Sequence, residues 1–115
     1  KPAAALTGAI DRCFGSMEDF LRSLRRISLA DKREGYTWLL SDKCGRLRLL
    51  FTLGQATALP LTPVLCLDLY RHAYELTYGD DRAAYVEAVM PLINWDALSR
   101  RYGAVFAGQP PFPNP

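Results

Sequence analysis

The sequence predicts an α+β domain in which two N-terminal helices precede a small antiparallel sheet and further helices follow it. Apolar residues between positions 6 and 24 recur three or four residues apart, which is helical spacing. From residue 36 two runs of strand-forming residues flank a short turn, which is typical of a β-hairpin. Three strands that follow the helices, and do not alternate with them, favour an antiparallel sheet. With 115 residues, half of them apolar, the chain has material for one core.

Two helices are expected over residues 3–13 and 17–29. Gly15 separates them, and Ser16 followed by Asp19 predicts an N-cap for the second helix. The exposed face of that helix carries three arginines: Arg22, Arg25 and Arg26. A surface for RNA or an acidic partner is one interpretation of these arginines, and a solvated helix face is the interpretation we favour.

Three antiparallel strands are expected near residues 36–41, 46–52 and 64–68, with the turn of the hairpin at residues 42–45. Helices should then return, and their expected ranges are 70–78, 83–90 and 94–102. We assign residues 1–107 to one domain. Residues 108–115 form a proline-rich tail that cannot continue a helix and should be extended.

Composition narrows the class of protein. No apolar run approaches the ~20 residues that a membrane-spanning helix needs, so no membrane contact is expected. A net charge of +2 is too small to argue for nucleic acid. Three scattered cysteines favour a reducing compartment and free or packed thiols: Cys13, Cys44 and Cys66. The chain opens on Lys1 without a methionine, which indicates a processed product or a segment of a longer polypeptide.

The most informative pair of residues is Asp68 and His72, because His72 is the only histidine of the chain. A carboxylate and an imidazole at this spacing can ligate one metal ion where a strand passes into a helix. A catalytic metal site usually has three or more protein ligands, however. If the pair binds a metal, its other ligands must come from elsewhere.

Four sequence blocks, in order, carry a resemblance to a known family. They are Phe14-Gly15-Ser16, Tyr36-Thr37-Trp38-Leu39, Asp68-x-Tyr70-x-His72-Ala73-Tyr74 and Asn94-Trp95. From Pro2 to Tyr102 the chain resembles the C-terminal domain of the iron/manganese superoxide dismutase family. The match is more specific than the Asp68–His72 spacing alone, because it covers most of the chain.

The resemblance implies that Asp68 and His72 occupy two of four protein ligand positions for iron or manganese. In the family the other two are histidines of an N-terminal helical domain. Gln55 falls where manganese-type members place the glutamine that hydrogen-bonds the metal-bound solvent, and Trp38 falls among the aromatic residues that wall the site. Without the resemblance, Gln55 would be a polar loop residue and Trp38 a core residue of a strand.

Three residues depart from the family pattern: Tyr70 stands where tryptophan is usual, Arg71 where glutamate is usual, and Glu75 where tyrosine is usual. The family glutamate crosses the dimer axis to hold the partner's ligand histidine. Arg71 has no acceptor and cannot replace it. Glu75 places a negative charge where an anionic substrate would approach, which opposes attraction of superoxide.

Two functions follow, and we favour the second. In the first, the chain is half of a working dismutase. In the second, the fold is kept as a structural subunit of a larger assembly, such as a mitochondrial small ribosomal subunit, and the enzyme site is a relic that keeps both ligands. The second implies the mitochondrial matrix, with the cytoplasm as the alternative. It also suggests a heterodimer with a homologous superoxide dismutase-like subunit that offers an acidic residue to Arg71. Arg71 could instead pair with Glu75 of an identical partner, or with Glu75 along its own helix.

Overall fold

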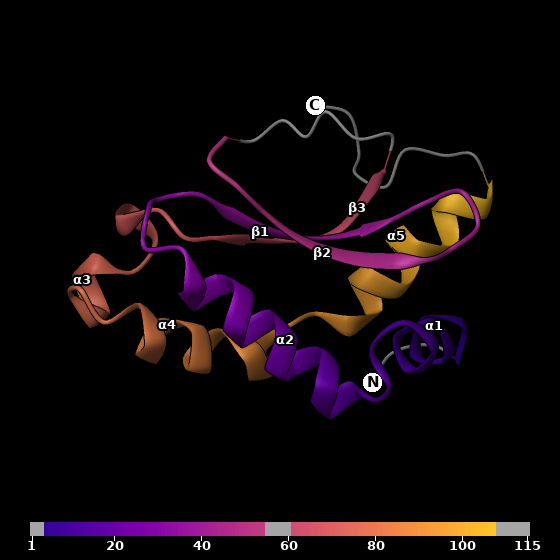
Figure 1. The fold of residues 1–115 in the computed structure, drawn as a ribbon, viewed down its shortest axis with the longest axis horizontal. Coiled ribbons are helices and arrows are strands. Elements are labelled where there is room, and N and C mark those ends of the chain that lie inside the picture. Colours follow the sequence, from indigo (N-terminus) through magenta and orange to yellow (C-terminus); the bar gives the residue numbers. More distant parts are fainter. Residues whose placement is uncertain (1–3, 55–60, 108–115) are drawn as a thin grey trace.

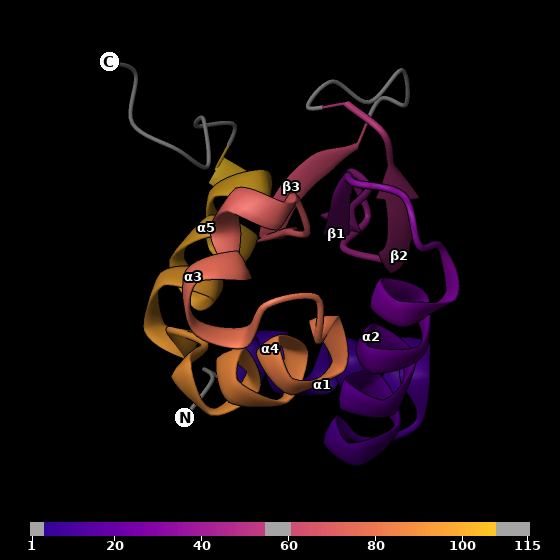
Figure 2. The same cartoon turned by 90° about the vertical axis from the view of Figure 1, so that its left-hand side faces the viewer.

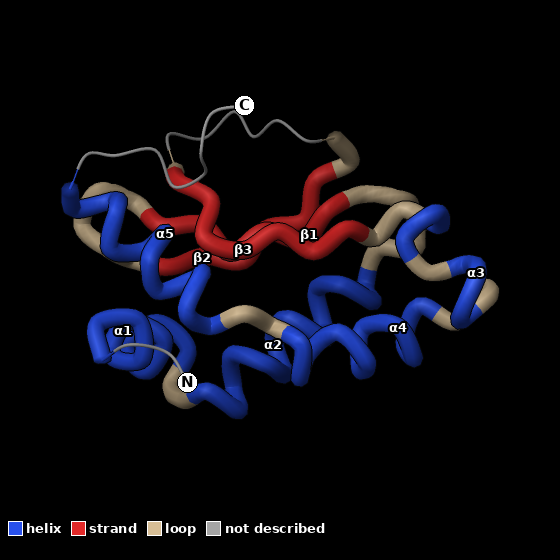
Figure 3. Tube along the Cα trace, turned by 180° about the vertical axis from the view of Figure 1, so that it is seen from behind, coloured by secondary structure: helices blue, strands red, loops and turns tan. Residues whose placement is uncertain are grey.

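Helices cover one face of a three-stranded sheet in the computed structural model of the protein, which describes residues 4–54 and 61–107 (Figure 1). Seen from behind, the sheet forms one layer and most of the helices form a second layer against it (Figure 3). The order of elements is two helices, three strands and a run of helices, so the expected α+β class is confirmed.

The two N-terminal helices are α1, Ala4–Phe14, and α2, Met17–Ala30, close to their expected ranges. Gly15 has a φ of 101°, a conformation that favours glycine, and it ends α1. The Ser16 side chain accepts a hydrogen bond from the Asp19 amide at 3.0 Å, which is the predicted N-cap. Both helices then bury their apolar sides against the sheet, and the core includes Leu6, Ile10, Phe20 and Leu24.

The sheet has the strand order β2-β1-β3 and is antiparallel throughout. Its strands are β1, Tyr36–Ser41, β2, Leu47–Thr52, and β3, Thr62–Asp68. The third strand begins two residues earlier than expected and contains Pro63, which an edge strand tolerates because its amide is not needed for pairing. Tyr36 lies opposite Thr52 on one side and Asp68 on the other.

Side chains of β1 alternate between two faces of the sheet. Thr37 points to the helices, because its hydroxyl accepts a hydrogen bond from Ser28 of α2. Tyr36 and Trp38 therefore lie on the opposite face. Asp68 shares that face with Tyr36, since directly opposed residues of antiparallel strands point the same way. The register thus places the candidate ligand on the aromatic face of the sheet.

The segment after β3 corrects one expectation. In place of a single helix over residues 70–78, the chain forms a 3-10 turn, Arg71–Ala73, and a one-turn helix, α3, Glu75–Tyr78. Tyr74 interrupts them with φ −138° and ψ −10°. Its ring is buried and stacks on Tyr85, with 5.1 Å between the centroids. Tertiary packing of this ring overrides the local helical pattern.

The C-terminal helices are α4, Arg82–Val89, a 3-10 turn, Met90–Leu92, and α5, Trp95–Ala107, which lies beside β3 (Figure 2). The expected end of the last helix at Tyr102 was wrong. Gly103 has no positive φ and does not act as a cap, while Leu98 and Tyr102 anchor the helix in the core. The proline-rich tail, 108–115, lies outside the described residues. Among the helices that are described, none is both long and apolar enough to cross a bilayer.

Candidate metal centre

The end of β3 brings the two candidate ligands together. Asp68 is the last residue of the strand, and His72 lies in the 3-10 turn that follows. Between them Tyr70 keeps an extended conformation, with φ −73° and ψ 147°, before the chain turns. As a result, Asp68 Oδ2 lies 3.0 Å from His72 Nε2. The structure therefore places these two side chains within hydrogen-bond distance of each other.

The Asp68 carboxylate is oriented by its own main chain. Its Oδ1 atom accepts a hydrogen bond from the Tyr70 amide at 3.0 Å, which leaves Oδ2 directed at His72. The backbone carbonyl of Asp68 accepts a hydrogen bond from the Tyr85 hydroxyl at 2.9 Å. Contacts of this kind hold a ligand in one orientation, which metal sites require of the groups around their ligands.

A row of aromatic rings runs from the sheet to His72. Trp38 and Tyr36 have ring centroids 5.9 Å apart, and Tyr36 and Tyr70 have centroids 5.2 Å apart. Tyr70 then stacks on the His72 imidazole, with 5.7 Å between centroids and 23° between planes. Trp38 and Tyr70 thus form one aromatic wall beside the Asp68–His72 pair, with Tyr36 between them.

The same aromatic residues hold the end of β2. The Trp38 indole N–H donates to the Thr52 hydroxyl at 2.7 Å, and the Tyr70 hydroxyl donates to the Leu53 carbonyl at 2.8 Å. Gln55, which the resemblance assigned to the metal-bound solvent, lies outside the described residues.

Arg71 finds its acidic partners within its own chain. Its guanidinium lies 2.6 Å from the Asp80 carboxylate and 3.6 Å from that of Glu75, and its amide donates to the Glu34 side chain at 2.9 Å. The pairing with Glu75, four residues along the same chain, is one of the three arrangements that the sequence left open. No sequence pattern indicated Asp80 or Glu34 as a partner of Arg71.

The donor set fits a transition metal, but as a partial site. An imidazole nitrogen and a carboxylate oxygen 3.0 Å apart can both lie about 2.0–2.2 Å from one ion. Among residues 4–54 and 61–107, no group of three or more histidine, cysteine or acidic side chains is placed to hold a metal. The pair is open to ligands from elsewhere, since the side chains of His72 and Asp68 are 68% and 37% exposed.

Cys66 is the nearest soft donor in the sequence, two residues before Asp68 on the same face of β3. The residue is exposed, yet partial burial of its thiol, and secondarily the charge of Asp68, raises the pKa of Cys66 to about 11.

Comparison with known proteins decides the family. Residues 2–101 match the model for the C-terminal domain of iron/manganese superoxide dismutases. The chain belongs to this family. It is 33% identical over 100 residues to the mitochondrial manganese superoxide dismutase of Schizosaccharomyces pombe, an alignment that covers 87% of this chain and 46% of that protein.

Bacterial relatives give a similar result. Identity is 33% over 98 residues to the manganese superoxide dismutase of Thermus thermophilus, covering 84% of this chain and 48% of the relative. Identity to the iron superoxide dismutase of Escherichia coli is 30% over 106 residues, an alignment that covers 90% of this chain and 55% of that protein. The superoxide dismutase-like chain thus spans about half the length of the curated relatives it matches.

Three residues that contribute to the site were not identified from the sequence. Tyr36 was assigned only to a strand, although its spacing of two from Trp38 places both rings on one face. Tyr85 and its neighbour Arg82 reach the end of β3 from α4, and no local pattern signals such a contact.

Proposed function

We propose that this chain is the C-terminal half of a metal-dependent superoxide dismutase and supplies Asp68 and His72 as two ligands of its iron or manganese. The observation that carries the proposal is the 3.0 Å approach of Asp68 Oδ2 to His72 Nε2. Support also comes from the family match over residues 2–101 and from relatives named as iron and manganese enzymes.

Each residue of the site has a role in this proposal. A bound iron or manganese ion would supply one-electron chemistry, by which one superoxide is oxidised and the next reduced. Asp68 would bind through Oδ2 while the Tyr70 amide holds Oδ1, and His72 would bind through Nε2. The rings of Tyr36, Trp38 and Tyr70 would exclude water from one side of the pair.

Among residues 4–54 and 61–107 no third side chain is placed to complete the site, so we propose that the remaining ligands come from further sequence of the same polypeptide or from another chain. The outward exposure of His72 supports this, because a complete site is normally enclosed. The Gln55 side chain is proposed to hydrogen-bond the metal-bound solvent, as the family resemblance implies. A compartment also follows as a proposal: two relatives are named as mitochondrial enzymes, which supports the mitochondrial matrix.

A structural subunit of a larger assembly is the second candidate. The substitutions at Arg71 and Glu75 favour it, because both change contacts that the family uses around its metal. Its more specific forms, a ribosomal subunit and a heterodimer, remain predictions without further support. The pairing of Arg71 with Asp80 also weakens the argument for a heterodimer, since Arg71 needs no acidic residue from a second subunit.

The test is a Mn²⁺ titration followed by NMR at the imidazole of His72. Because the chain has one histidine, its ring signals are unambiguous, and a bound paramagnetic ion will broaden them selectively. We expect weak binding and no dismutase turnover by the isolated chain, since two ligands leave an ion mostly hydrated. Tight, stoichiometric metal with rapid superoxide consumption would refute that expectation.

Two variants make the titration specific. Asp68→Asn should weaken the broadening of His72 by about 10-fold or more, a loss typical of altering a metal site. Asp42→Asn is the matched control, because Asp42 is another partly exposed aspartate that accepts backbone hydrogen bonds, at the opposite end of β1. Equal broadening in both variants, or none in the wild type, would reject the metal site and favour the structural role.

A further inference from the structure

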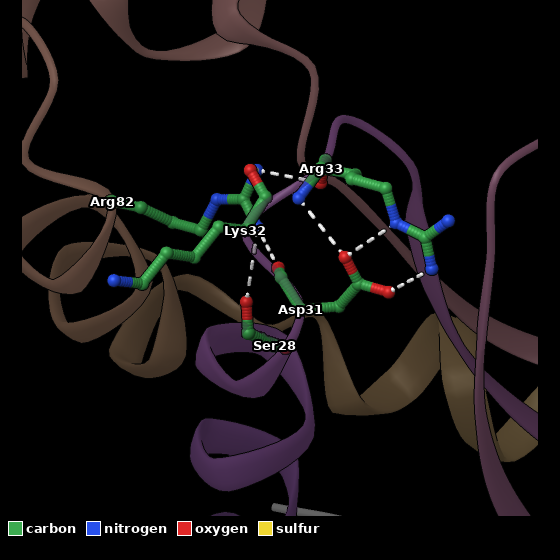
Figure 4. Close-up of polar contacts among 5 residues, drawn as sticks. All are labelled: Ser28, Asp31, Lys32, Arg33 and Arg82. Atoms are coloured by element: carbon green, nitrogen blue, oxygen red, sulfur yellow. Dashed lines mark hydrogen bonds and ion pairs between the residues drawn. The ribbon is translucent and has the colours of Figure 1, made fainter.

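Arg82 joins three segments that are distant in sequence. From the start of α4 its guanidinium reaches the loop that follows α2 (Figure 4). It donates to the carbonyls of Asp31 at 2.6 Å and Arg33 at 2.9 Å, with longer contacts to those of Ser28 and Lys32. A further bond, of 3.1 Å, goes to the carbonyl of Leu69, the residue after Asp68.

The second contact from α4 is to Asp68 itself. The Tyr85 hydroxyl donates to the Asp68 carbonyl at 2.9 Å. Arg82 and Tyr85 are three residues apart and so lie on one side of α4, where they bind two consecutive carbonyls at the end of β3. Two hydrogen bonds to adjacent peptide groups fix both the position and the rotation of the chain that carries the Asp68 side chain.

The chain that follows His72 is held by α4 as well. Tyr74 is buried, stacks on the Tyr85 ring at 5.1 Å, and lies beneath the Arg82 guanidinium with 6.0 Å from its carbon to the ring centroid. The segment from Asp68 to Tyr74 is therefore attached to α4 at both ends. His72, in the middle, is left exposed.

We propose that α4 is the element that positions the Asp68–His72 pair, with Tyr85 and Arg82 as positioning residues that touch neither metal nor substrate. This deepens the proposed function and rests on it for its chemical purpose. The physical reason is geometric: Asp68 ends β3 and His72 lies in a short 3-10 turn that no full helix continues, so a neighbouring helix supplies the rigidity of this segment. Arg82 suits this task because its planar fork of donors can bind several carbonyls at once.

The amide of Tyr70 reports the position of Asp68 without any metal, because it donates to Asp68 Oδ1. The experiment is hydrogen exchange of this amide, measured by NMR in Tyr85→Phe and Arg82→Lys. We expect exchange to accelerate about five-fold in Tyr85→Phe, the shift in local opening that one lost neutral hydrogen bond produces. Arg82→Lys keeps the charge but loses the fork, and should accelerate exchange at least as much.

Tyr102→Phe is the matched control. The Tyr102 hydroxyl also donates to a backbone carbonyl, that of Gly45 at 2.8 Å, but at the opposite end of the sheet. It should lower overall stability without changing exchange at Tyr70. If Tyr70 exchanges equally fast in Tyr85→Phe, Tyr102→Phe and the wild type, the inference is overturned. Protection of amides in β1 shows in each variant that the fold is retained.

A Mn²⁺ titration of His72 in the same variants links position to binding. We expect Tyr85→Phe to weaken the broadening several-fold, toward the lower end of the about 10–100-fold losses caused by altering groups around metal ligands. The experiments distinguish failure of the proposed metal site from failure of the positioning role of α4. Absence of broadening in the wild type rejects the proposed metal site, whereas unchanged Tyr70 exchange in Tyr85→Phe rejects the positioning role of α4.

Discussion

The hydroxyl of Ser28 donates a hydrogen bond to the hydroxyl of Thr37 at 3.0 Å, and both side chains are fully buried. The bond connects α2 to the central strand of the sheet. Because side chains alternate along β1, fixing Thr37 on the helical face also fixes Tyr36 and Trp38 on the face that carries Asp68. A buried contact on one side of the sheet thus orients the aromatic wall on the other.

Removing one member of this pair should be costly. Ser28→Ala leaves the Thr37 hydroxyl buried without its partner, and we expect a loss of about 1–3 kcal/mol in the free energy of unfolding, measured with urea. Thr37→Val combined with Ser28→Ala removes both polar groups, so the double variant should lose less than the sum of the single losses. Strict additivity of the two losses would show that the hydroxyls do not act as a pair.

Gly35 should not tolerate a side chain. A Cβ atom there would lie 2.3 Å from the Thr52 carbonyl oxygen and 2.6 Å from the Phe51 ring. Gly35→Ala therefore forces the start of β1 away from β2. We expect the free energy of unfolding to fall by about 1–3 kcal/mol, as it does when a side chain is inserted into other well-packed sites. The Thr52 hydroxyl accepts a hydrogen bond from the Trp38 indole, so displacement of Thr52 should change the environment of Trp38. Tryptophan fluorescence should therefore shift as well.

Gly103 provides the control for that substitution. It lies within α5, is exposed, and has nothing within 4 Å of the position of an added Cβ. Gly103→Ala should therefore raise the free energy of unfolding by about 0.5–1 kcal/mol, because alanine loses less backbone freedom in a helix. A loss at Gly103 comparable to that at Gly35 would mean that the clash at Gly35 is not the cause.

Much of this architecture follows from local pattern. Apolar spacing located α1 and α2, Ser16 located the start of α2, and alternation located the strands, because each of these signals acts within a few residues. The four-residue spacing of Asp68 and His72 allowed both side chains to meet at the end of a strand, and their atoms lie 3.0 Å apart.

Long-range contacts account for what the sequence did not predict. The helix expected over residues 70–78 is interrupted because Tyr74 packs on Tyr85, a contact between separate elements. Arg82 could not be assigned a role, because its acceptors are carbonyls, which every residue carries. Around Arg71, neither Glu34, which precedes β1, nor Asp80, which follows α3, was predicted, whereas Glu75, four residues along the chain, was among the partners that the sequence left open.

The surroundings of Arg71 predict that restoring the family glutamate will harm this chain. Arg71→Glu would place a fourth carboxylate among those of Glu34, Glu75 and Asp80, and like charges at this spacing repel. We expect the free energy of unfolding, measured with urea, to fall by up to about 1 kcal/mol. This loss should be smaller at high salt, because these groups are exposed and salt screens their charges.

Arg71→Gln removes the ion pairs without adding charge and serves as the control. It should lose less stability than Arg71→Glu, with a weaker dependence on salt. If Arg71→Glu is as stable as the wild type at low salt, the acidic surroundings do not explain why arginine occupies this position.

The acid side of the stability profile should depend on Asp31, which caps the end of α2. Hydrogen bonds from the Arg33 side chain, and then from its amide, lower the pKa of Asp31 from 3.8 to about 2. A carboxylate whose pKa is lowered by folding stabilises the folded state when the pH is above the pKa of the unfolded state. This contribution is lost as the pH falls from about 4 through about 2. In Asp31→Asn the loss of stability relative to wild type should therefore shrink across that interval.

Arg33→Gln should move the pKa of Asp31 back toward 3.8, which carboxyl NMR measures directly. Arg22→Gln is the matched control, since Arg22 pairs with Asp19 on α2 and its side chain is 67% exposed against 68% for Arg33. The effect also bears on the candidate site, because the Asp31 carbonyl accepts from Arg82, which holds Leu69. If Arg33→Gln leaves the pKa of Asp31 near 2, the hydrogen bonds from the Arg33 side chain are not what lowers it.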